Sequence, residues 1–223
     1  MLALLVLFAC TPPDEGNDSA DTGDTGAGWS GPCPPGTVLV GDFCIDAWEA
    51  TVTGDAGPED QGSTWPEHVS TASAAPLEGV VPTDLLSWYQ ASAACGNAGK
   101  HLCTVTEWQL ACGTTVLPWG EEPLAEEVCA LPAPDGTTAW TELQPTGSLP
   151  GCRSPEGVYD QIGNAWEWAD PETTDAEGLP HAAKMGGAFY AGAGNGNCVV
   201  GPFLDHPPAF SGTIAARCCV DAR

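Results

Sequence analysis

The side chains with the widest chemical range in this 223-residue chain are its eleven cysteines. Thiolates bind soft metals and act as nucleophiles, but no Cys-x-x-Cys redox motif is present. The histidines stand singly, at His68, His101, His181 and His206. Neither a Ser-His-Asp signature nor a phosphate-binding glycine loop is recognisable. Asp46 and Glu49 form a carboxylate pair, which on one short strand we expect to be structural.

The cysteines also indicate the compartment. Eleven thiols in a chain of this size favour an oxidising environment and disulfide bonds. Cys33 and Cys44 flank a predicted hairpin and are expected to pair across it. Adjacent Cys218 and Cys219 cannot easily bond each other, so each is expected to reach a different segment. The residues alone leave the remaining connectivity open.

The first residues indicate export. Residues 1–9 are apolar, and Leu7-Phe8-Ala9-Cys10 resembles a bacterial lipobox, in which the cysteine is acylated after cleavage. We therefore predict a signal segment at 1–9, lipidation of Cys10 and a membrane anchor in the cell envelope, at the bacterial outer membrane or in the periplasm. The alternatives are secretion after an ordinary signal peptide and a chance apolar start, since the run is short and lacks basic residues. Lipidation of Cys10 leaves an even ten cysteines for disulfides.

Composition separates a tether from one folded domain. Residues 10–32 are acidic and poor in bulky apolar side chains, so we expect a flexible tether. Residues 33–223 have the length of one domain, and the 28 glycines and 21 prolines of the chain predict a loop-rich fold. The formal net charge of −25 repels phosphate backbones and excludes nucleic-acid binding.

Local patterns predict a few short elements. Residues 38–46 alternate in polarity around Gly41-Asp42, which indicates two strands and a tight turn. Residues 53–80 are rich in Gly, Pro and Ser and are predicted to be loop. Residues 84–97 have a helical apolar spacing. Thr104 and Glu107 have the spacing of a capping box, which predicts a second helix ending at Gly113.

Several segments resemble motifs of the formylglycine-generating enzyme family, also called the sulfatase-modifying-factor domain, and they occur along the chain in the order of the family. The most specific is 157–168, which reads Gly-Val-Tyr-Asp-Gln-Ile-Gly-Asn-Ala-Trp-Glu-Trp. The others are 43–51, Ser87-Trp88 with 99–108, Pro118-Trp119-Gly120, Gly186-Gly187-Ala188-Phe189 and Arg217-Cys218. For residues 33–223 the resemblance implies an α+β, loop-rich fold related to C-type lectins, with little regular secondary structure and several disulfides.

The resemblance does not carry over the catalytic metal. The oxidases of the family convert a sulfatase cysteine to formylglycine with two copper(I)-binding cysteines, whose positions fall on Ala191 and Gly196. Neither residue has a thiolate for copper(I), so we expect no copper and no catalysis. The alternative is a copper-dependent oxidase acting on sulfatase-type substrates, in which Cys198 and another thiol rebuild the site. A free thiol distinguishes the two hypotheses.

The resemblance also implies a structural calcium site. The family's ligands, two side-chain oxygens and two backbone carbonyls, fall on Asp160, Gly163, Ala165 and Glu167. Calcium takes six to eight such oxygens from flexible segments. Aspartate at 160, where the family commonly has asparagine, should strengthen the site. The alternative is a Trp-rich turn in which Glu167 caps backbone amides.

The family's disulfides suggest two long-range pairs. One joins Cys95 to Cys218, and the second joins Cys112 to a partner near Cys198. Such cross-links are expected to stabilise a fold with few long elements.

We therefore expect an exported binding module for a protein or glycan, stabilised by calcium. Its binding face is predicted in the loops 53–80, 121–155 and 190–212. A cell-surface scaffold subunit is a rival hypothesis, and the Glu-Pro-Asn and Gln-Pro-Asp triplets typical of sugar-binding lectins are absent. Aromatic candidates for the face, each with a place in the core as the alternative, are Trp65, Trp140, Phe189 and Tyr190.

Overall fold

The computed structural model describes most of the chain beyond residue 28. The described residues are 29–55, 71–113, 115, 117–118, 128–133, 136–137, 140–174, 176, 178, 181–191, 196–198, 203–206 (backbone only) and 212–223. The predicted signal segment, Cys10 and Trp65 lie outside these ranges. Trp29 and Pro32, at the end of the predicted tether, contact Arg223: the guanidinium lies 3.7 Å from the Trp29 ring centroid, and Arg223 N donates to Pro32 O.

The first sheet joins the two ends of the domain. Its strands, in spatial order, are β1 (Thr37–Val40), β2 (Phe43–Asp46), β10 (Cys218–Asp221) and β5 (His101–Leu102), all antiparallel to their neighbours. Gly41, at φ 59°, and Asp42 form the predicted turn between β1 and β2. The hairpin expected in 38–46 is confirmed.

Two further sheets complete the strands. The larger has the order β8 (Phe203–His206), β7 (Ala182–Met185), β6 (Trp166–Ala169) and β9 (Ile214–Ala216), with β6 parallel to β9. The smaller pairs β3 (Ala50–Thr53) with β4 (Ser73–Pro76). The prediction that 53–80 is all loop is therefore wrong at β4. Ser-Ala-Ala-Pro has little intrinsic strand preference, and β4 forms because it pairs with β3 and packs against α1.

Both helices begin at capping boxes. In α1 (Trp88–Asn97) the Ser87 hydroxyl accepts from Gln90 N, and in α2 (Val105–Cys112) the Thr104 hydroxyl accepts from Glu107 N. The second cap and the end at Gly113 are confirmed. The first helix starts later than the predicted residue 84, because the chain turns through a left-handed φ of 58° at Leu85 before the cap.

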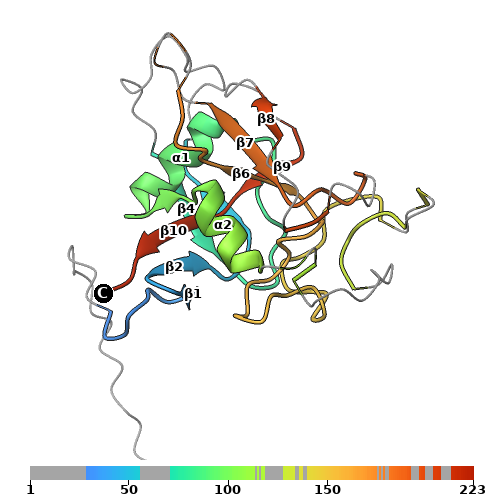
Figure 1. Cartoon of the computed structure of the whole chain (residues 1–223), viewed down its shortest axis with the longest axis horizontal. Helices are drawn as coiled ribbons and strands as arrows, with labels where there is room; N and C mark the ends of the chain where they lie inside the picture. The colour runs from blue at the N-terminus through green and yellow to red at the C-terminus, as the bar shows by residue number, and fades with distance from the viewer. Residues whose placement is uncertain are drawn as a thin grey trace, which may run out of the picture.

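The core is divided into two apolar clusters. One surrounds α1, with Trp88, Trp168 and Ile214, and the other surrounds α2, with Trp108 and Ile45. In Figure 1 the yellow and orange loops that follow α2 gather on the side of the molecule opposite the C-terminus. No helix among the described residues is long and apolar enough to span a membrane.

Five disulfides fasten these parts together. The predicted pairs Cys33–Cys44 and Cys95–Cys218 are present, and Cys112, whose partner was expected near Cys198, is bonded to Cys198 itself. The pairs that the sequence left open are Cys103–Cys219 and Cys129–Cys152. Cys218 and Cys219 therefore reach different segments, as expected, because neighbouring side chains of a strand point to opposite faces.

Candidate functional site

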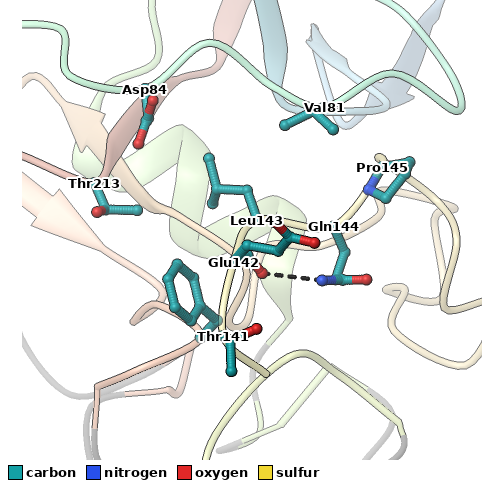
Figure 2. A pocket seen from close by; sticks show the side chains of 9 residues that line it. Val81, Asp84, Thr141, Glu142, Leu143, Gln144, Pro145 and Thr213 are labelled. Carbon is teal, nitrogen blue, oxygen red and sulfur yellow. Dashed lines mark hydrogen bonds between the residues drawn. The ribbon is translucent and has the colours of Figure 1, made fainter. Parts of the chain in front are cut away.

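A cleft of about 560 Å³ lies where three loops meet. Figure 2 shows Val81 and Asp84 across from residues 141–145, with Thr213 at one end. The lining combines aliphatic, hydroxyl, amide and carboxylate groups, namely Val81, Asp84, Thr141, Glu142, Leu143, Gln144, Pro145, Phe189 and Thr213. Such a mixture of apolar surface and a few polar groups is typical of ligand sites.

Asn164, in the signature segment, positions one wall of the cleft. Its side-chain oxygen accepts from Gln144 N at 2.8 Å, and its amide nitrogen donates to Gln144 O at 3.2 Å and to Glu49 Oε2 at 2.6 Å. Its backbone carbonyl accepts from Phe189 N at 2.9 Å. Asn164 adopts a left-handed φ of 56°, which asparagine tolerates better than most residues. One buried amide thus fixes the 141–145 wall relative to Phe189.

The facing wall, segment 77–85, is tied to the first one beside the cleft. Thr146 N donates to Val80 O at 3.0 Å, and Thr146 O accepts from Gly79 N at 2.9 Å. These bonds join the two walls like a short ladder, so the cleft is formed before any ligand enters.

A buried ion pair lies in the core beneath the signature segment. Arg217 and Glu167 are both fully buried, and Arg217 Nη2 lies 2.5 Å from Glu167 Oε1. Arg217 Nε donates to both Glu167 oxygens, at 3.0 and 2.9 Å, and Trp108 Nε1 donates to Oε2 at 2.5 Å. The guanidinium also donates to the carbonyls of Asp46 and Tyr159, at 2.8 and 2.7 Å. Arg217 thus links the signature strand β6 to the first sheet.

Two more carboxylates share this buried region. Burial raises the pKa of Glu49 well above its ordinary value, and the neighbouring charges of Asp160 and Glu167 raise it further. Burial also raises the pKa of Asp160 to about 6, against the opposing effects of the Gly147 amide and Arg217. Gly147 N donates to Asp160 Oδ2 at 2.6 Å. The carboxyl groups of Glu49, Asp160 and Glu167 thus share one buried cation, Arg217, which bonds directly to Glu167.

Both predicted carboxylate ligands of calcium, Asp160 and Glu167, accept hydrogen bonds in this structure. Glu167 accepts four hydrogen bonds from Arg217 and Trp108, which is about all that the lone pairs of a carboxylate accept. Asp160 uses one oxygen to accept from the backbone amide of Gly147. A Cβ on Gly163 would lie 2.5 Å from Ala130 O, so glycine at this position also serves packing. Within the described ranges no three His, Cys, Asp or Glu side chains form a group that could hold a metal, and the calcium site stays a prediction.

We expect Asp160→Asn to stabilise the domain by about 1–3 kcal/mol at pH 7 in the presence of EDTA. Asparagine removes a buried charge, keeps an acceptor for Gly147 N and suits the left-handed φ of 58° at this position. Because the folded pKa is raised, this carboxyl destabilises the folded state once it ionises. The gain should therefore be largest above about pH 6 and vanish near pH 4.

Urea unfolding of both proteins between pH 4 and 7.5 measures this difference. Asp42→Asn, at an exposed turn, is the matched control for the general relief of negative charge. An Asp160→Asn gain no larger than that of Asp42→Asn, or independent of pH, would contradict the prediction.

The positions that align with copper ligands are unsuited to that role. Ala191 is buried, and a Cβ on Gly196 would lie 2.5 Å from Leu131 Cδ1, so a cysteine there would displace the core. Cys198 is bonded to Cys112. All ten cysteines that the structure describes are paired, so none of them offers a thiolate.

The sequence-predicted residues are brought together only in part. Asp46 is a structural residue, as expected: its carboxylate accepts from Cys218 N and pairs with Lys100. Phe189 lines the cleft, Tyr190 is 53 % exposed beside it, and Trp140 is half-buried.

The sequence reading missed Asn164, Arg217 and Asp84 as site-forming residues. For Arg217 a signal was available: it is a charged residue within the apolar run 214–220 near the end of the sequence. A charge that is buried with such a run requires a partner. The predicted binding loop 121–155 contains residues 141–145 of the cleft. Asp84 was not included in a binding loop, because residues 84–97 have a helical pattern.

Comparisons with known proteins agree with this geometry. The family model of the sulfatase-modifying factor enzyme 1-like domain matches residues 16–206. The chain is 32 % identical over 96 residues to the inactive C-alpha-formylglycine-generating enzyme 2 of Bos taurus, covering 39 % of this chain and 32 % of that protein. It is 28 % identical over 128 residues to the formylglycine-generating enzyme of Bos taurus, covering 47 % and 34 %. The chain spans about a third of the length of these curated relatives.

Solved structures give the fold. The crystal structure of CarF superposes with a TM-score of 0.54 at 19 % identity, covering 80 % of this chain and 86 % of that one. The Major Tropism Determinant P3c variant superposes with a TM-score of 0.53 at 18 % identity, covering 86 % and 54 %. The fold is C-type lectin-like, as expected.

Proposed function

Because the chain belongs to the family of sulfatase-modifying factor enzyme 1-like domains, we propose that it is an exported, lipid-anchored binding module that holds a protein or glycan in the cleft. The observation that carries this proposal is the cleft itself, with walls fixed by Asn164 and Thr146. Similarity to a relative named inactive and to a tropism determinant supports binding rather than oxidation.

The rival function is formylglycine generation with copper(I). It needs a pair of thiolates, and Cys198 is engaged with Cys112. Alkylation of the denatured, unreduced mature protein followed by intact mass counts the free thiols and detects a lipid on Cys10. Zero free thiols supports the binding module, whereas two that include Cys198 would revive the oxidase. An unlipidated Cys10 would overturn the lipid anchor.

Calcium is tested separately from the cleft. A calcium-dependent rise in melting temperature that is smaller in Asp160→Asn supports the predicted site, because this variant removes one predicted carboxylate ligand and keeps the Arg217–Glu167 pair. At that site the Glu167 carboxylate would exchange Arg217 for the metal. Equal melting temperatures in calcium chloride and in EDTA would overturn it.

We expect Val81→Arg to weaken ligand binding at least about tenfold, because a bulky side chain enters the cleft and fills its volume. Val81 is 48 % exposed, so the substitution is compatible with folding. Leu39→Arg, at a 46 % exposed site on β1, is the matched control. The measurement is binding of the purified full chain to peptide and glycan arrays, followed by titration of the best probe. Equal affinity of the Val81 and Leu39 variants would overturn the assignment of the cleft.

A further inference from the structure

We propose that the cleft selects a polypeptide ligand by holding a lysine or arginine side chain between Asp84 and Glu142. The proposal rests on the proposed function of the cleft as the binding site, and it adds the chemical class of the ligand. The stem of such a side chain would lie along Leu143, which Figure 2 shows between the two acids, and Val81 adds apolar surface to the same cleft.

The charges of the chain support a cationic ligand. Against 30 acidic residues there are five basic ones, and none of the five lines the cleft. Each has a partner elsewhere: Lys100 pairs with Asp46, Arg153 with the Tyr159 hydroxyl, Lys184 lies over Trp166, Arg217 pairs with Glu167, and Arg223 lies over Trp29. No lysine or arginine in the cleft lining therefore neutralises its acids, and the overall field of the protein attracts positive ligands.

Asp84 is held in place to receive such a group. Leu85 N donates to Gly212 O at 2.8 Å, and Ser87 caps α1, so both sides of the Leu85 turn are fixed. The Asp84 side chain is half-buried, and burial raises its pKa above the ordinary value. A partly desolvated carboxylate gains more from a bound cation than an exposed one.

The surface beside the cleft favours a polypeptide over a glycan. Four aliphatic side chains of the segment 77–85 are well exposed: Leu77 at 44 %, Val80 at 38 %, Val81 at 48 % and Leu85 at 59 %. Several exposed apolar side chains in one short segment are typical of protein interaction sites. These side chains suit the apolar neighbours of a basic residue in a peptide. The rings that could stack on a sugar are Phe189 in the cleft and Tyr190 beside it, so the test also includes methyl glycosides.

The test uses three capped pentapeptides, acetyl-Gly-Val-X-Val-Gly-amide with X as lysine, norleucine or glutamate. Amide shifts of the isotope-labelled full chain are followed by NMR during titration. We expect the lysine peptide to bind about tenfold more tightly than the norleucine peptide, with shifts at Leu143 and Thr213, and the glutamate peptide not to bind. Asp84→Asn and Glu142→Gln should each reduce the lysine preference about threefold or more. Glu156→Gln, at an exposed acid that does not line the cleft, should leave it unchanged.

The possible outcomes separate this inference from the proposed function. Equal affinity for the lysine and norleucine peptides, or an unchanged preference in Asp84→Asn, would overturn the inference. Shifts of cleft amides with methyl glycosides but with none of the peptides would also overturn it, while leaving the cleft as a binding site. If neither panel shifts a cleft amide and array ligands bind the Val81→Arg variant normally, the proposed function itself fails.

Discussion

Replacing Arg217 with methionine is expected to destabilise the domain by about 3–5 kcal/mol at pH 7, a large fraction of the roughly 5–15 kcal/mol by which a typical domain is stable. The side chain is fully buried, and it donates to Glu167 and to the carbonyls of Asp46 and Tyr159. Methionine fills much of the volume but leaves Glu167 charged in the core beside Glu49 and without its cation. A buried carboxylate that loses its partner is among the most destabilising defects in a protein.

Control variants separate charge from packing. Arg153→Met makes the same change at an exposed arginine and should alter the free energy of unfolding by no more than about 0.5 kcal/mol. Adding Glu167→Gln to Arg217→Met removes the stranded charge and should recover part of the loss, with an interaction energy above about 1 kcal/mol in the double-mutant cycle. Urea unfolding at pH 7 measures the wild type, the single variants Arg217→Met, Arg153→Met and Glu167→Gln, and the double variant. If Arg217→Met resembled Arg153→Met, the buried pair would have no stabilising role.

Local sequence signals predicted the elements whose determinants lie within a few residues. The hairpin around Gly41-Asp42 and the cap formed by Thr104 and Glu107 depend on neighbouring residues, so their patterns were sufficient. The first helix was displaced because the Leu85 turn is stabilised by a long-range bond to Gly212 O. The spacing of apolar residues along the sequence does not indicate a hydrogen bond to a residue so far away in the chain.

The cleft was harder to predict because distant segments build it. The signature segment was assigned to calcium, yet Asn164 within it organises Gln144, Glu49 and Phe189. Those partners lie up to 115 residues away in the chain. A single sequence read alone indicates that a buried amide needs partners, but it does not indicate which ones.

Removing the Cys95–Cys218 disulfide with alanines is expected to destabilise the domain by only about 2–3 kcal/mol. The bond spans 123 residues, and in isolation a loop of that length would predict about 5 kcal/mol. Cys103–Cys219 spans 116 residues between neighbouring positions. While Cys103–Cys219 remains, it holds residues near 95 and 218 close together in the unfolded chain. Cys95–Cys218 therefore closes an additional loop of only about ten residues.

The same reasoning predicts that the two bonds replace each other in part. Removing both should release a much larger loop, limited by Cys112–Cys198 to about 30 residues, and should cost about 6 kcal/mol in all. Removal of Cys33–Cys44, which spans 11 residues, is the reference for a small loop and should cost about as much as either single pair. Urea unfolding under oxidising conditions measures these values. With Cys112–Cys198 intact, a cross-link that acted alone would close a loop of about 30 to 37 residues, so a loss near 4 kcal/mol for either pair alone would mean that the two cross-links act independently. In that case the disulfides from β10 to α1 and to the residue before the α2 cap would each stabilise the domain without sharing a loop.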